Sequence, residues 1–185
     1  MHHSVSTKMN KQIISLSINT PRLLLINSTI PILETAITGK DHLAALLDIT
    51  IPDQWSEFGD APFIYALEKV KANRGSDMWW SWLPILKSEN TLIGNGGYKG
   101  PPQDGMVEIG YEVALAYRQQ GFATEIALAL VAYAFTHADV HTVIAHTLPE
   151  ENASVRVLRR CGFTFAGEVM DPEDGLIWKW KLSEK

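Results

Sequence analysis

The chain has 185 residues, of which 46% are hydrophobic and 20% are charged, and its formal net charge is −5. A chain of this length and balance is expected to form one domain whose core is large enough to fold without disulfides. The negative charge argues against a general nucleic-acid-binding protein, and the single cysteine, Cys161, excludes an internal disulfide and is typical of a reducing compartment.

No apolar run is long enough to span a membrane, and residues 1–11 are polar and lack the apolar centre of a signal peptide. We therefore predict a cytoplasmic protein that binds neither membrane nor nucleic acid and is a monomer or a homodimer. Residues 1–20 are expected to be a flexible tail. Residues 21–185 are expected to be a single domain, because no linker or internal repeat interrupts them.

The first half of the chain begins with a strand and several short helices. Residues 22–27 are an apolar run typical of a strand. Helical spacing and end signals then predict helices over 29–39, 41–47 and 63–71, and Pro52 and Gly59 mark a loop over 51–60.

Two strands are expected next, over 78–86 and 91–98. The first contains three tryptophans, which we interpret as core and sheet-face packing rather than as a ligand cage. The second contains three glycines that indicate a β-bulge or a close backbone approach, namely Gly94, Gly96 and Gly97.

The central part of the chain predicts a strand, a loop and a long apolar helix. Residues 107–115 are rich in β-branched and aromatic residues, and a helix of mostly Ala, Leu, Ile and Val follows the loop over 118–124 and extends to residue 135. The chain then completes a mixed α/β sheet with a strand, a helix and two strands, over 140–147, 152–161, 163–170 and 177–182.

The loop over 118–124 is a candidate phosphate site. Backbone N–H groups at the start of a helix have no intrahelical partner, and the helix dipole adds a partial positive charge there. Gly121 lets the backbone approach a ligand closely, Ala123 leaves room, and Thr124 adds a hydroxyl donor. The loop lacks the Gly-Lys-Ser/Thr of an ATP-binding P-loop and the GxGxxG of a dinucleotide-binding fold.

Two motifs in this order resemble the GNAT superfamily of N-acetyltransferases. Arg118, Gly121 and Ala123 fill that family's pyrophosphate-loop pattern, Gln/Arg-x-x-Gly-x-Gly/Ala, and residues 146–165 are similar to its later motif, in which an Asn- and Ser-containing helix start leads to Gly-Phe. The phrase VEIGYEV resembles, more narrowly, the branch of ribosomal-protein N-terminal acetyltransferases. The resemblance implies a mixed, mostly antiparallel sheet with helices on both faces and a splay between two central strands.

The resemblance also implies a site for acetyl-CoA. Its pantetheine arm would pair like an added strand with the backbone of Val113, Ala114 and Leu115, and an N–H near Val113 would polarise the acetyl carbonyl. Asn152 would bond the pantetheine, or it is a plain helix cap. The loop residues expected to hold the phosphates are Arg118, Gln119, Gln120, Gly121, Phe122, Ala123 and Thr124, although Arg118 could also be a solvated surface charge.

The acceptor amine is protonated near neutral pH and must lose a proton before it attacks. Period-two alternation places Glu108, Gly110 and Glu112 on one face of the central strand. The family uses a Glu at the place of Glu108 as the base in some members, so Glu108 is our first candidate. His146, near the end of the neighbouring strand, is the alternative, and the third is a water relay or no dedicated base.

The departing thiolate must gain a proton. Many family members carry a Tyr for this four residues before the Gly of Gly-Phe, but here that position is Leu158. Ser154 lies one turn earlier on the same helix face and is the candidate acid. Its alternative role is to satisfy backbone N–H groups in the first helical turn.

The acceptor pocket is expected from residues 41–71, chiefly the loop 51–60, with help from residues 79–82. The acidic residues Asp53, Glu57 and Asp60 of that loop would suit a cationic amine. The histidines show no metal-ligand spacing, and we expect no metal.

The resemblance therefore predicts an acetyl-CoA-dependent N-acetyltransferase. It would move an acetyl group to a primary amine, of a small molecule or a protein N-terminus, by direct attack in a ternary complex. The missing Tyr leaves open a catalytically degenerate module that binds acetyl-CoA without turnover. An O-acyltransferase, or an enzyme that uses a longer acyl chain, is a third alternative.

Overall fold

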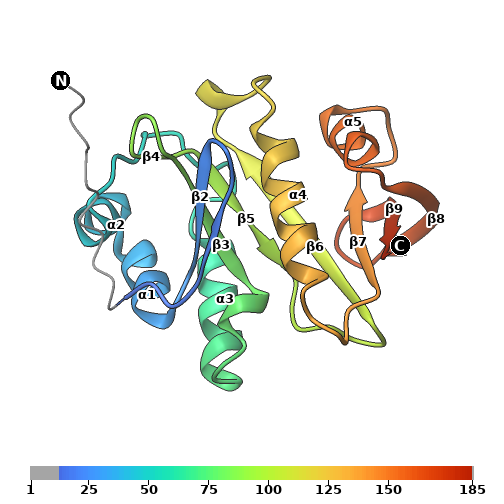
Figure 1. Ribbon diagram of the computed structural model, residues 1–185, viewed down its shortest axis with the longest axis horizontal. Coiled ribbons are helices and arrows are strands. Elements are labelled where there is room, and N and C mark those ends of the chain that lie inside the picture. The colour runs from blue at the N-terminus through green and yellow to red at the C-terminus, as the bar shows by residue number, and fades with distance from the viewer. Residues whose placement is uncertain (1–12, 185) are drawn as a thin grey trace.

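The computed structural model describes residues 13–184, which form one nine-stranded sheet with helices on both faces (Figure 1). The strands are β1 Ser17–Asn19, β2 Leu23–Asn27, β3 Ser81–Leu86, β4 Thr91–Leu92, β5 Gly94–Tyr98, β6 Met106–Val113, β7 Thr142–Thr147, β8 Thr164–Asp171 and β9 Gly175–Ser183. The helices are α1 Ile30–Thr38, α2 Lys40–Leu47, α3 Ala61–Ala72, α4 Phe122–Ala134 and α5 Ala153–Arg160. None of these helices is long and apolar enough to cross a membrane.

The strand order is β1-β2-β3-β5-β6-β7-β9-β8, with β4 paired to β3. Every pairing is antiparallel except that of β6 with β7. The mixed, mostly antiparallel sheet predicted from the sequence is therefore confirmed.

Alternation along the strands separates two hydrophobic cores. On β3, Trp82 points into a core with α4 and α5, whereas the next residue, Leu83, points into a core with α1, α2 and α3. Both side chains are fully buried. All three tryptophans of the segment 78–86 are buried, as packing residues should be, although Trp80 also borders a cavity described below.

Several predicted boundaries were wrong. Residues 17–19 form β1 rather than part of a loose tail, while residues 1–12 of that predicted tail lie outside the described residues. Residues 77–79 form a 3₁₀ turn before β3 begins at Ser81. The central strand ends at Val113, because residues 115–117 turn into a second 3₁₀ helix.

The predicted strand over 91–98 is split at residue 93 into β4 and β5, and β5 contains two glycines with close backbone contacts. A Cβ atom at Gly94 would lie 2.2 Å from the carbonyl oxygen of Glu112, and one at Gly97 would lie 1.8 Å from that of Trp80. Both glycines also have positive φ angles. The glycine-rich pattern therefore marks a close backbone approach, one of the two interpretations it allowed.

The two central strands separate along their length. Strand β6 pairs with β7 over only three positions, from Met106–Thr142 to Glu108–Ile144. Beyond Glu108, β6 remains paired with β5 and β7 with β9, so a gap opens between them. Figure 1 shows α4 lying over β6 beside this gap and α5 beyond it, next to β7. The predicted splay is confirmed.

Candidate active site

The loop before α4 presents a set of free backbone donors. The first intrahelical bond runs from the N–H of Glu125 to the carbonyl of Gly121, at 3.1 Å. The N–H groups of residues 121–124 therefore have no partner inside the helix. Gln119 and Gly121 both adopt left-handed conformations, with φ angles of 61° and 82°. Such turns aim successive N–H groups at one point, which is the geometry of an anion site.

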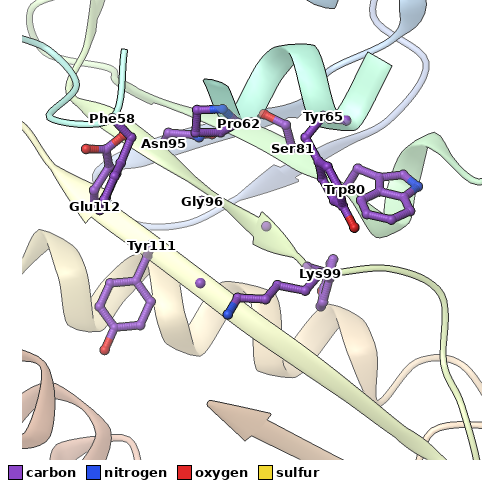
Figure 2. Close-up of a pocket in the computed structure, with 14 residues that line it drawn as sticks. Phe58, Pro62, Tyr65, Trp80, Ser81, Asn95, Gly96, Lys99, Tyr111 and Glu112 are labelled. Carbon is purple, nitrogen blue, oxygen red and sulfur yellow. Dashed lines mark hydrogen bonds between the residues drawn. The ribbon is translucent and has the colours of Figure 1, made fainter. Parts of the chain in front are cut away.

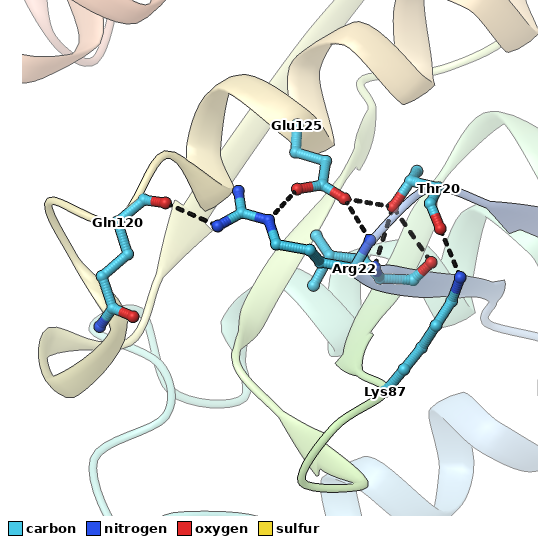
Figure 3. Close-up of polar contacts among 6 residues, drawn as sticks. Thr20, Arg22, Lys87, Gln120 and Glu125 are labelled. Atoms are coloured by element: carbon cyan, nitrogen blue, oxygen red, sulfur yellow. Dashed lines mark hydrogen bonds and ion pairs between the residues drawn. The ribbon is translucent and has the colours of Figure 1, made fainter.

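A cation that the sequence did not indicate braces this loop. Arg22 donates from Nη1 to the carbonyl of Gln120 at 2.8 Å and from Nε to Glu125 at 2.7 Å (Figure 3). Its guanidinium also lies 4.2 Å from the centre of the Phe122 ring. Burial opposes the charge on Glu125, but bonds from Thr20 and Arg22 outweigh it and lower the pKa of that carboxyl. Arg22 is about one hundred residues away in sequence, and no local pattern could have found it.

Arg118 lies elsewhere than the predicted phosphate role suggests. Its Nε donates to the carbonyl of Val113 at 2.9 Å, and its Nη2 lies 2.7 Å from Glu57 of the loop 51–60. This side chain therefore links the loop before α4 to the end of β6 and to the loop on the far side of the sheet.

The backbone at the end of β6 is only partly free. The N–H of Lys99 donates to the carbonyl of Glu108 and that of Ala114 donates to the carbonyl of Ile93, so even-numbered residues of β6 face β5. By alternation, the N–H of Val113 faces the gap. Ala114 has its N–H occupied, and Leu115 lies in the 3₁₀ turn, so only Val113 of the three predicted pantetheine contacts presents strand backbone to the gap.

The two candidate bases contact each other. His146 Nδ1 lies 2.9 Å from Glu108 Oε1, and Lys99 Nζ lies 2.7 Å from the same oxygen. The side chains of Glu108 and His146 are about four-fifths buried, at 19% and 18% exposed. Because both contacts fall on Oε1, Glu108 Oε2 has no partner among residues 13–184. The sequence placed Glu108 and His146 on adjacent strands, but it gave no sign of Lys99.

The neighbouring carboxylate, Glu112, is fully engaged. Ser56 Oγ donates to its Oε1 at 2.7 Å, and the N–H of Glu57 donates to its Oε2 at 2.9 Å. These bonds hold the loop 51–60 over the sheet face opposite α4. A cavity lies beneath that loop, between α3, β5 and β6 (Figure 2). The loop predicted to build the acceptor pocket thus borders a pocket, with Trp80 on its opposite wall.

Comparison with known proteins explains why these features occur together. A family model described as an acetyltransferase (GNAT) domain matches residues 41–164, more than half of the chain. The chain belongs to the GNAT acetyltransferase family. An uncharacterized N-acetyltransferase of Bacillus subtilis (strain 168), YjdG, is 29% identical to it over 150 residues, which cover 79% of this chain and 88% of that protein.

Solved structures show that the fold is that of the GNAT acetyltransferases. A putative ribosomal-protein-serine acetyltransferase from Vibrio cholerae has a TM-score of 0.65 at 20% identity, covering 92% of this chain and 98% of its own. RimL, a ribosomal alpha-N-protein acetyltransferase in complex with coenzyme A, has a TM-score of 0.63 at 16% identity, covering 91% and 98%. The predicted likeness to the ribosomal-protein branch is therefore confirmed at the level of the fold.

The described residues fit the coenzyme that GNAT enzymes use. Two buried side-chain oxygens, Tyr111 Oη and Thr124 Oγ1, have no hydrogen-bond partner among residues 13–184. Tyr111 packs against the core under α4, and burial followed by the charge of nearby Cys161 raises the pKa of its phenol well above its ordinary value. Buried polar groups normally have partners, so orphaned oxygens beside a free helix N-terminus and an open strand edge are the pattern expected where a polar ligand binds.

Helix α5, the second GNAT motif, is capped by Asn152. Its side chain accepts from the N–H of Val155 at 3.0 Å. Ser154 makes no side-chain hydrogen bond to another described residue, so its alternative role as the cap is wrong. Leu158 is buried in the core, and Arg159 forms a bidentate ion pair with Glu151, at 2.6 and 2.8 Å.

We predict that Asn152→Ala lowers the stability of the protein by about 1 kcal/mol, because one N–H of α5 loses its acceptor. In a domain of this size the melting temperature should fall by about 2–4 °C. Asn152→Asp keeps an acceptor oxygen and should melt close to wild type. An unchanged melting temperature in Asn152→Ala, together with weaker acetyl-CoA binding, would instead favour the pantetheine contact.

Proposed function

We propose that the protein is an acetyl-CoA-dependent N-acetyltransferase that acetylates a primary amine by direct attack in a ternary complex. The observation that carries the proposal is the position of Glu108 Oε2, a carboxylate oxygen with no partner among residues 13–184, on β6 where β6 and β7 begin to separate. Acetyl-CoA supplies the activated thioester when it is bound. The free amides of residues 119–124, with Arg22 and Thr124 beside them, are proposed to bind its phosphates.

Glu108 is the proposed general base. Its Oε1 is fixed by His146 and Lys99, which holds Oε2 in one orientation. We propose that Oε2 takes the proton of the acceptor ammonium. His146, whose Nδ1 is hydrogen-bonded to the same carboxylate, is proposed to help spread the charge that this proton brings. Glu112 is a poorer base, because both of its oxygens already accept hydrogen bonds. The N–H of Val113, which faces the gap, is proposed to orient and polarise the acetyl oxygen.

Ser154 remains the proposed proton donor to the departing thiolate. Its hydroxyl is not used as the helix cap, and it lies in the first turn of α5, where the helix dipole favours negative charge nearby. The thiolate is therefore already partly stabilised by the helix, and a weak acid such as a hydroxyl suffices to protonate it. Tyr111, with its orphaned and buried phenol, is a second candidate for this role.

We predict that Ser154→Ala lowers kcat by about 10- to 100-fold and leaves the melting temperature unchanged, because Asn152 keeps the cap. Steady-state kinetics and thermal melts on the same preparation measure both effects. Tyr111→Phe, measured in parallel, should retain its rate. A normal rate in Ser154→Ala with a large loss in Tyr111→Phe would transfer the acid role to Tyr111.

Release of free thiol from acetyl-CoA tests the proposed function. The purified protein is mixed with acetyl-CoA and a panel of amines that includes small primary amines and peptides with free N-termini. Amine-dependent thiol release is the expected result. Binding of acetyl-CoA without release in the presence of any amine would favour the degenerate module.

A further inference from the structure

We infer that the acceptor is a primary amine attached to an apolar body of about one aromatic ring, without a second positive charge. This inference rests on the proposed function, because it names the amine that the same site takes. Phenethylamine and the N-terminus of a peptide that begins with Phe share this chemistry. A polyamine does not.

The shape of the cavity is the first support. Its floor is made of glycines of β5 and β6, and a Cβ atom on Gly110 would meet nothing within 4 Å. The sheet therefore leaves space above Gly110, between Glu108 and Glu112 on the same face. Each of these residues is about 7 Å away along the strand, two steps of a strand's rise. The cavity volume is about 260 Å³, just below the roughly 300–1,000 Å³ of pockets that hold drug-sized ligands, and it suits one side chain or one small amine.

The walls of the cavity are mostly apolar. Trp80 and Tyr65 pack edge to face, with ring centres 5.8 Å apart, and Phe58 and Pro62 close the other side (Figure 2). Phe58 and Tyr65 are 65% and 52% exposed although they are large and hydrophobic. Exposed aromatic side chains gathered around one cavity are typical of a binding site for an apolar group.

The charges around the cavity disfavour a polycation. Glu112 has no free carboxylate oxygen, and Glu57 of the loop is paired with Arg118. Asp53 of the same loop is paired with Lys40 at 2.9 Å. Two of the three acidic residues that the sequence suggested for a cationic substrate, Asp53 and Glu57, are therefore paired within the protein itself, whereas Asp60 has no ion pair among residues 13–184.

Two lysines add positive charge at the rim. Lys99 lines the cavity, and Lys69 Nζ lies 5.0 Å from the centre of the Tyr65 ring. Asp171, at the end of β8, accepts from the N–H groups of Asp174 and Glu173, which lower the pKa of its carboxyl together with the nearby charges of Lys99 and His146. We assign Glu108 Oε2, on the sheet face that the cavity opens on, to receive one ammonium group, and a second ammonium would lie near Lys99 and Lys69.

The test compares kcat/KM for phenethylamine, a peptide beginning with Phe, a peptide beginning with Ser and spermidine. We expect one or both aromatic amines to exceed spermidine and the Ser peptide by at least about 10-fold, as the loss of apolar contacts in a pocket predicts. Preference for phenethylamine over the Phe peptide would name a small-molecule acceptor, and the reverse would name a protein N-terminus. A preference for spermidine or for the Ser peptide would overturn the inference while leaving the acetyltransferase in place.

Variants of the exposed aromatic residues provide the second arm. Phe58→Ser and Tyr65→Ser should each raise KM for the preferred aromatic amine by about 10-fold, with little change in kcat. Ile64→Ser is the matched control: Ile64 lies beside Tyr65 on α3 and is equally exposed at 52%, but it does not line the cavity. An unchanged KM in both aromatic variants would contradict the inference.

Binding separates failure of this inference from failure of the proposed function. Calorimetric titration of phenethylamine into the protein with coenzyme A present needs no turnover. Binding that Phe58→Ser weakens and Ile64→Ser does not, in a protein that releases no thiol with any amine, would support the pocket and overturn the enzyme. Thiol release with hydrophilic amines, without any phenethylamine binding, would support the enzyme and overturn the pocket.

Discussion

Gly121→Glu is expected to abolish binding of acetyl-CoA while the far-UV circular dichroism spectrum stays native. Gly121 is exposed, and the atom nearest to an added Cβ would be Arg22 Nη2 at 3.5 Å, so the side chain fits without a clash. Its carboxylate, however, would lie where the free amides of the loop converge. Two unit charges 4 Å apart near a protein surface interact by about 4 kcal/mol, which corresponds to a loss of about 10³-fold in affinity.

Two controls separate charge from backbone strain. Gly121 has a φ of 82°, a conformation that costs any other residue roughly 1–2 kcal/mol. Gly121→Ala carries the strain without the charge and should bind only slightly less tightly. Gly75→Glu places the same side chain at a φ of 91° in an exposed turn with open space around it, and should bind as wild type does. Isothermal titration calorimetry measures all four proteins, and wild-type affinity in folded Gly121→Glu would refute the loop as the phosphate site.

Glu108→Gln is expected to lower kcat by at least about 10-fold, because the amide keeps the shape of the carboxylate but cannot take up a proton. The low-pH limb of the rate profile should change as well, since that limb reports protonation of the base. Glu68→Gln removes an exposed carboxylate of α3 outside the cavity and should keep both rate and profile. An unaltered profile in Glu108→Gln would move the base to His146 or to water.

The contact between Glu108 and His146 predicts how mutations of the two residues combine. If the two side chains act as one unit, His146→Gln added to Glu108→Gln should lower kcat little further than Glu108→Gln alone. A loss in kcat in the double variant equal to the product of the two single losses would show that the residues act independently, in spite of the 2.9 Å contact.

The features predicted correctly from the sequence were those with a local signal. Helix α4 begins at Phe122, directly after the Gly that marked the loop, and α5 ends before Gly162, the Gly of the Gly-Phe motif, which has a φ of 89°. The period-two pattern of β6 also placed Glu108 and Glu112 on one face, which the structure confirms through their contacts with Lys99 and Ser56.

The features that were missed depend on distant segments. Strand β1 exists because it pairs with β2, and its three residues carry no strand signal of their own. The end of β6 at Val113 is set where the N–H of Ala114 reaches Ile93 on the neighbouring strand. Arg22 and Lys99 belong to no motif in the sequence, and only the fold brings them to Glu125 and Glu108. Local patterns hold no information on such pairs, because the pairing is a property of the sheet.

Transfer of an isotopically labelled acetyl group from acetyl-CoA to an amine, followed by mass spectrometry of the amine, tests the central claim most directly. The proposed function predicts that the label appears on the amine nitrogen in amounts equal to the thiol released. It also predicts that both products fall together in Glu108→Gln. Thiol release without a labelled amine, or tight binding of acetyl-CoA with neither product, would contradict the assignment of this site to amine acetylation.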